Sequence, residues 1–72
     1  MRLSDAGKGK YYRIEEIELT KDIKCRLTAL GLTEDTVILV EENSKGPTII
    51  RARGTRLAMG DKYSRGILVG EM

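Results

Sequence analysis

The amino-acid sequence predicts a mainly β protein, in which five short strands close into a small barrel and one short α-helix is inserted after the first strand. Several short runs alternate apolar and polar residues with period two, which is typical of half-buried strands. One segment has the helical period instead, and glycine and other turn residues separate the runs. In a chain of 72 residues, closing the strands into a barrel limits their exposed edges; an open sheet with the helix on one face is the alternative.

The first strand is expected at residues 11–19, after a polar segment that enters it as an ordered loop or tail. Tyr12 and Ile14 fall on one face of this strand, and the residues beside them fall on the other. The alternation fails at Glu16 and Ile17, which favours a bulge or a bend there.

A short helix is expected within residues 20–32. Three apolar residues share one helical stripe, at spacings i, i+4 and i+7: Ile23, Leu27 and Leu30. Thr20 is a good N-cap, and Gly31 supplies the left-handed residue that ends a helix. Leu32 can then pack on Leu27, as in a Schellman-type ending. A helix this short is marginal alone in water, so we expect the stripe to dock on the sheet.

The remaining strands are expected at residues 36–42, 48–53, 55–59 and 67–69. The run at residues 36–42 is apolar on both faces, which indicates a central strand. Turn residues at 43–47 join it to the next strand as a hairpin. Gly54 breaks that strand, and a tight connection at residues 60–66, with at most one helical turn, precedes the last one.

The composition argues against catalysis. The chain has no histidine and a single cysteine, Cys25, which excludes an internal disulfide, a Cys/His zinc site and histidine-activated nucleophiles. Cys25 lies opposite the apolar stripe and is interpreted as an incidental surface thiol. The glycines have neither the P-loop nor the Rossmann spacing. We therefore expect no enzyme activity, no cofactor and no small-molecule substrate. A weak divalent-ion site at Glu16 and Glu18 is the only metal alternative.

No apolar run exceeds four residues, so we expect no insertion into a membrane. The first eight residues lack the apolar core of a signal peptide, and the lone thiol suits a reducing compartment. Together these observations predict a cytoplasmic protein.

Bases outnumber acids in the second half of the chain. Residues 45–65 carry six bases and one acid, although the whole chain has a net charge of only +2. The excess predicts a basic face. Lysines also alternate with tyrosines at residues 8–12, so nucleic-acid binding is an alternative function, weakened by the low net charge and the absence of Phe and Trp.

Two segments resemble the FeoA family, small SH3-like proteins of bacterial ferrous iron uptake. They are RLTALGLT at residues 26–33 and GPTIIRARGTRLAMG at residues 46–60. The opening also matches, at Leu3-Ser4, Gly9 and the YRI of residues 12–14, so the resemblance covers nearly the whole chain. It implies one FeoA/SH3-like domain over residues 1–72. One departure is Asp35, where the family commonly has glycine in the turn before the second strand.

The resemblance implies a partner, the cytosolic part of a FeoB-like membrane GTPase transporter, which the protein would bind or regulate as an accessory. The same barrel occurs as the C-terminal domain of iron-dependent repressors of the DtxR type, so a general protein-interaction module is an alternative. Self-association through an edge strand is another. For the partner-binding surface we expect Arg51, Arg53, Arg56, Lys62, Tyr63 and Arg65. Arginine pairs bidentately with carboxylates, and Tyr and Arg are favoured at interfaces.

Overall fold

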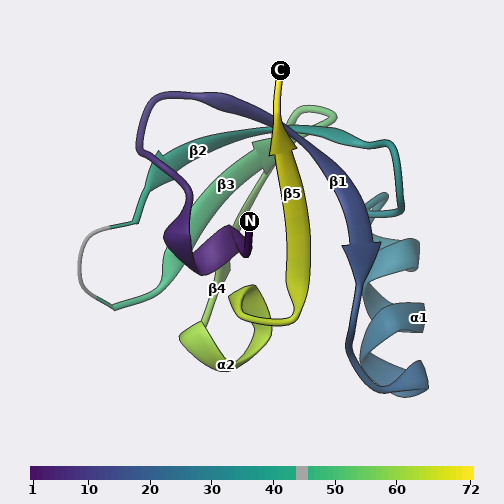
Figure 1. Cartoon of the computed structure of the whole chain (residues 1–72). Helices are drawn as coiled ribbons and strands as arrows, with labels where there is room; N and C mark the ends of the chain where they lie inside the picture. Colours follow the sequence, from purple (N-terminus) through teal and green to yellow (C-terminus); the bar gives the residue numbers. More distant parts are fainter. Residues whose placement is uncertain (44–45) are drawn as a thin grey trace.

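The computed structural model describes residues 1–43 and 46–72 (Figure 1). Five antiparallel strands form one sheet in the order β4-β3-β2-β1-β5. The strands are β1 (Tyr11–Ile17), β2 (Val37–Glu42), β3 (Thr48–Ala52), β4 (Thr55–Met59) and β5 (Ile67–Glu71). A 3₁₀ turn, η1 (Leu3–Asp5), precedes β1, helix α1 (Lys21–Ala29) follows β1, and helix α2 (Asp61–Ser64) joins β4 to β5. The predicted fold class, mainly β with a helix after the first strand, is confirmed.

The sheet curls around one apolar core as an SH3-like barrel (Figure 1). Alternate residues of the strands point inward, joined by Leu3 and Leu32, and the most deeply buried are Leu3, Tyr12, Ile14, Leu32, Ile38, Val40, Ile50, Ile67 and Val69. Each aliphatic side chain buried this way contributes about 1.5–3 kcal/mol to folding. The seam of the barrel lies between the edge strands β4 and β5. Within residues 1–43 and 46–72 no ladder joins those two strands, and α2 spans the seam instead.

Strand β1 contains the irregularity that the broken alternation predicted, one residue earlier than expected. Ile14 pairs with Val69 and Glu16 pairs with Leu68, so Glu15 is the extra residue of a β-bulge. The strand then ends at Ile17, two residues before the predicted limit.

Helix α1 has the predicted caps. The Thr20 side chain accepts a hydrogen bond from the Ile23 amide at 3.4 Å. At the other end Gly31 has φ +88°, and the Leu32 amide donates to the Leu27 carbonyl at 2.8 Å, which is the long bond of a Schellman motif. The expected docking of the whole apolar stripe is wrong at Leu30, which is 48% exposed.

The central position predicted for residues 36–42 is confirmed, because β2 lies third of the five strands. Of the turn predicted at 43–47, residues 44–45 lie outside the described part of the chain. Strand β3 ends at Ala52, so the prediction that Arg53 lies in this strand is wrong. Arg53 and Gly54 have φ +52° and +78°, and they form a two-residue turn into β4. Asp35 also has a left-handed backbone, with φ +72°.

The segment before β1 is an ordered part of the fold. Met1 and Val69 exchange two backbone bonds, of 3.0 Å from the amino terminus to the Val69 carbonyl and 2.7 Å from the Val69 amide to the Met1 carbonyl. Arg2 forms an isolated bridge to Leu68. The outer edge of β5 is therefore covered by the start of the chain.

Candidate partner-binding groove

An apolar groove lies between α1 on one side and the end of β4 with α2 on the other; we call it the α1–β4 groove. One hollow, of about 250 Å³, is lined by Ile23, Arg26 and Leu27 of α1 and by Ala58, Met59, Gly60 and Tyr63 across from them. A second hollow, of about 270 Å³, adjoins it and is lined by Leu19, Thr20, Ile23, Lys62 and Tyr63. Both hollows contain Ile23 and Tyr63, so they form one continuous depression.

The groove exists because the apolar stripe of α1 is only partly used by the core. Leu27 is buried, Ile23 is half-buried and Leu30 is 48% exposed. Across the groove, Met59 is buried while Tyr63 is 37% exposed. An amphipathic helix normally buries its whole apolar stripe against one element. In this protein part of the apolar stripe stays exposed, so a second element can pack against it.

Two cations stand at the rim of the groove, Arg26 of α1 and Lys62 of α2. Across the described residues, neither has a carboxylate within ion-pair distance. An acidic group brought by a ligand would therefore find both side chains available.

Among the described residues, three bases of the second half of the chain, Arg51, Arg56 and Arg65, are paired with acids. On the outer face of the sheet, Arg51 and Arg56 are direct cross-strand neighbours, and both contact Glu41. The distances from Arg51 Nε and Arg56 Nε to the Glu41 carboxylate oxygens are 2.8 and 2.7 Å. The hydrogen bond from Arg51, aided by the charges of both guanidinium groups, holds the pKa of Glu41 below its ordinary value, against a smaller opposing effect of desolvation.

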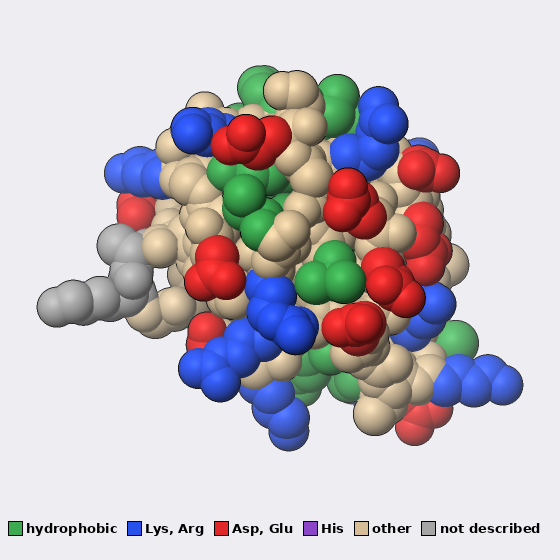
Figure 2. All heavy atoms as spheres, viewed as in Figure 1, with side chains coloured by type: hydrophobic (Ala, Val, Ile, Leu, Met, Phe, Trp, Pro, Cys, Tyr) green, Lys and Arg blue, Asp and Glu red, His purple; other side chains and the backbone are tan. Residues whose placement is uncertain are grey.

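Other bases are paired in the same way. Arg65 lies 2.6 Å from Asp61 and Lys8 lies 3.2 Å from Glu42. Figure 2 shows basic and acidic side chains together on the viewed face of the molecule. The charge pattern is therefore mixed, which does not favour a nucleic-acid surface.

The six residues predicted from the sequence do not form one cluster. Tyr63 and Lys62 line the α1–β4 groove. Arg53 lies in the β3–β4 turn with its side chain over Gly31, where a Cβ would sit 3.1 Å from the Arg53 Cδ. Arg51 and Arg56 lie on the outer face of the sheet, and Arg65 follows α2.

Sequence reasoning did not select Ile23, Arg26 or Met59 as site residues, although they line the groove beside Tyr63. The sequence pattern places Ile23 on the apolar stripe of the helix and Met59 on one face of a strand. Arg26 adjoins that stripe, three residues after Ile23, and this spacing was the available signal.

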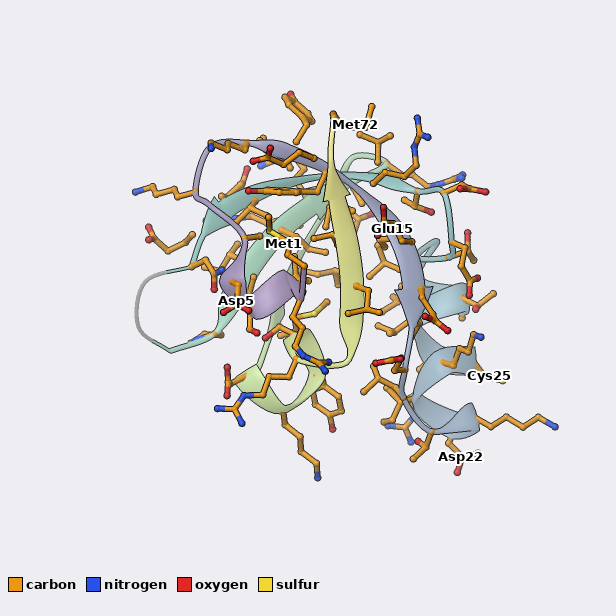
Figure 3. The ribbon with its side chains drawn as sticks, viewed as in Figure 1. Met1, Asp5, Glu15, Asp22, Cys25 and Met72 are labelled. Atoms are coloured by element: carbon orange, nitrogen blue, oxygen red, sulfur yellow. The ribbon has the colours of Figure 1, made fainter. Side chains whose placement is uncertain are left out.

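Two other features bear on chemistry. In the described ranges, no cluster of three or more potential metal ligands is present. At the predicted weak ion site of Glu16 and Glu18, the Glu18 carboxylate lies 3.7 Å from the Arg2 guanidinium group. Cys25 is exposed on α1 and is labelled there in Figure 3. The described residues include no helix with the length and apolarity that crossing a membrane requires.

The fold and the groove define a class, the small SH3-like barrel with an open apolar depression beside its helix. Comparison with known proteins narrows this class. The FeoA domain family matches residues 1–71, and the chain therefore belongs to the FeoA family.

Solved structures agree. A crystal structure of an iron uptake regulatory protein (FeoA) is 30% identical, with a TM-score of 0.88, over 100% of this chain and 96% of that one. FeoA from Chlorobium tepidum is 23% identical, with a TM-score of 0.92, over 100% of this chain and 70% of that one. A manganese-dependent transcriptional repressor shares the fold at 15% identity, with a TM-score of 0.86, over 100% of this chain and 41% of that one. No curated protein sequence matches.

Proposed function

We propose that this protein is a non-catalytic, cytosolic accessory protein of ferrous iron uptake, which binds the cytosolic part of a FeoB-like membrane GTPase transporter and regulates it. Membership of the FeoA family supports the link to iron uptake. A similar protein is named as an iron uptake regulatory protein, and another, from Clostridium thermocellum, as iron(II) transport protein A.

The α1–β4 groove is the observation that carries the binding role. Its apolar lining can bury a partner's side chain, and one aliphatic side chain taken out of water contributes about 1.5–3 kcal/mol. Tyr63 is a suitable anchor, because tyrosine is enriched among the residues that dominate binding energy at interfaces. Arg26 and Lys62 at the rim would orient an acidic partner and speed its association.

The arginines predicted from the sequence take a secondary place in this proposal. Arg51 and Arg56 already share Glu41, so a partner carboxylate would have to compete with that residue. Arg53 has no ion pair among the described residues and lies at the far end of β4. Arg53 therefore extends the proposed surface, whereas Arg51, Arg56 and Arg65 flank it.

A binding measurement with matched tyrosine variants tests the proposal. The purified protein is titrated with the cytosolic part of the FeoB-like transporter from the same organism, by isothermal titration calorimetry. Tyr63→Ala is expected to weaken binding about tenfold or more, which corresponds to at least ~1.4 kcal/mol. The control is Tyr11→Ala, because Tyr11 is 58% exposed and lies on β1, outside the groove.

The outcomes separate the two parts of the proposal. If the wild-type protein does not bind the transporter, the proposed function is wrong. If it binds and Tyr63→Ala behaves like Tyr11→Ala, the groove is not the contact surface. If the protein instead binds RNA or DNA with a steep salt dependence, the nucleic-acid alternative is correct despite the mixed surface charge.

A further inference from the structure

The two edges of the sheet differ in what covers them. The outer edge of β5 is bonded to residues 1–2 through the exchange between Met1 and Val69. The outer edge of β4 has no such cover in the described residues. An uncovered edge strand presents a row of unpaired backbone groups that can pair with another chain.

The register identifies the groups on this edge. Ala52 and Thr55 flank the two-residue turn and form a hydrogen-bonded pair, and in an antiparallel ladder such pairs alternate. Leu57 and Met59 therefore also bond to β3. The amide and carbonyl groups of Arg56 and Ala58 point the other way, out of the sheet.

The free edge runs along the α1–β4 groove. At the end of β4, Ala58 and Met59 line the groove opposite Leu27 of α1. At the start of β4, the Arg53 side chain meets Gly31 at the end of the same helix. Helix α1 thus accompanies β4 as the opposite wall. An edge strand beside an apolar groove suits an extended peptide, which adds to the sheet and places alternate side chains in the groove.

The charges around the groove indicate the composition of that peptide. Arg26 and Lys62 line the groove, and Arg53 lies beyond it, over Gly31 at the end of α1. In the part of the chain that the structure describes, none of these three cations forms an ion pair. The lining between these cations is apolar. A strand that alternates apolar with acidic residues complements both features.

We infer that the partner docks by strand addition: an extended segment of alternating apolar and acidic residues pairs with the backbone of Arg56 and Ala58 and directs its apolar side chains into the α1–β4 groove. This inference rests on the proposed function in taking the occupant to be a protein, and it adds the mode of binding and the chemistry of the bound segment.

Amide hydrogen exchange measured by NMR tests the inference with two probes. One is the purified cytosolic part of the FeoB-like transporter; the other is a twelve-residue peptide that alternates valine with glutamate and threonine, blocked at both ends. Each probe is expected to slow exchange at Arg56 and Ala58 tenfold or more. Exchange at Leu57 and Met59, which already bond to β3, should change little. Unslowed exchange at Arg56 and Ala58 under saturating transporter overturns the inference.

A pair of variants gives an independent readout. Ala58→Pro removes the outward amide without removing a bond to β3, and proline is tolerated where a strand's N–H faces solvent. It is expected to weaken peptide binding about tenfold, whereas Tyr11→Ala, on β1 and outside the groove, should leave peptide binding unchanged. If the proline variant does not fold, two isomers of the peptide, N-methylated at alternate amides, replace it: only one of the two should lose binding. Equal affinity of the two isomers overturns the inference.

Failure of this inference is distinguishable from failure of the proposed function. Transporter binding without protection of Arg56 and Ala58 contradicts strand addition and leaves the accessory role intact. If the protein binds the peptide with protection of Arg56 and Ala58 but does not bind the transporter, strand addition is supported and the choice of partner is wrong.

Discussion

Replacing Asn43 with alanine should strongly destabilise the fold, because this one side chain fastens the start of the chain to the sheet. The Asn43 amide group lies 3.2, 3.1 and 2.8 Å from the carbonyl oxygens of Leu3, Ser4 and Ala6. Its oxygen accepts from the Thr48 hydroxyl at 2.8 Å.

The magnitude follows from counting these bonds. An amide NH₂ has two hydrogens, so at most two of its three contacts are full hydrogen bonds at once. Two such bonds and the one from Thr48, at a net ~1 kcal/mol each, give about 3 kcal/mol, and the stranded Thr48 hydroxyl adds to this because Thr48 is 2% exposed. A chain of 72 residues has a total stability of roughly 4–11 kcal/mol. Asn43→Ala therefore removes a large fraction of it.

Urea denaturation followed by circular dichroism measures the change in the free energy of unfolding. We expect a loss of about 3 kcal/mol for Asn43→Ala and about 1 kcal/mol for Thr48→Val, which deletes only the hydroxyl bond. Asn43→Asp keeps the shape and an acceptor but removes both donors, so it should cost at least as much as the alanine variant. A cost below about 0.5 kcal/mol for Asn43→Ala would refute the reasoning.

Three further predictions concern α1 and the outer face of the sheet. Gly31→Ala should cost about 1–2 kcal/mol in unfolding free energy, since φ is +88° at this position; a cost near zero would contradict the strain argument. Leu27→Ala should cost about 2–3 kcal/mol and Leu30→Ala less than 0.5 kcal/mol, because only Leu27 is buried, and equal costs would contradict this assignment. The pKa of Glu41 lies below its ordinary value in the folded state, so its stabilising contribution is present above the unfolded pKa and is lost as pH falls through the folded pKa. By NMR, the pKa of the Glu41 carboxyl group should therefore lie below the ordinary value for glutamate and should rise toward it in Arg51→Gln; no movement would show that Arg51 is not the cause.

Local patterns predicted the elements well because each depends on near neighbours. Strand β4 has the predicted bounds, and the bond from the Leu32 amide to the Leu27 carbonyl depends on the left-handed Gly31 beside it. Leu30 was misjudged because periodicity shows which residues share a helix face, not how much of that face another element covers. Arg53 was misjudged because a left-handed arginine has no signature in composition, and the turn became visible only with the register of β3 and β4.

The site was harder to predict than the fold. Arg51 and Arg56 were selected from an excess of bases, yet their common partner Glu41 lies on another strand and is brought there by the pairing of β2 with β3. Separation in the sequence also hid the groove, whose walls come from residues 19–27 and 58–63. Its two identifying properties, apolar lining and unpaired cations, exist only after those segments meet.

The covered edge of β5 limits what this protein can assemble into. A ribbon of copies that grows by joining sheet to sheet needs two open edges on every subunit, and here Met1 and Arg2 occupy one of them. Any joining through β4 therefore ends after a single addition, either of a foreign segment or of a second copy related by a two-fold axis. A small sheet protein with one such terminating edge can keep the other available for binding without polymerising.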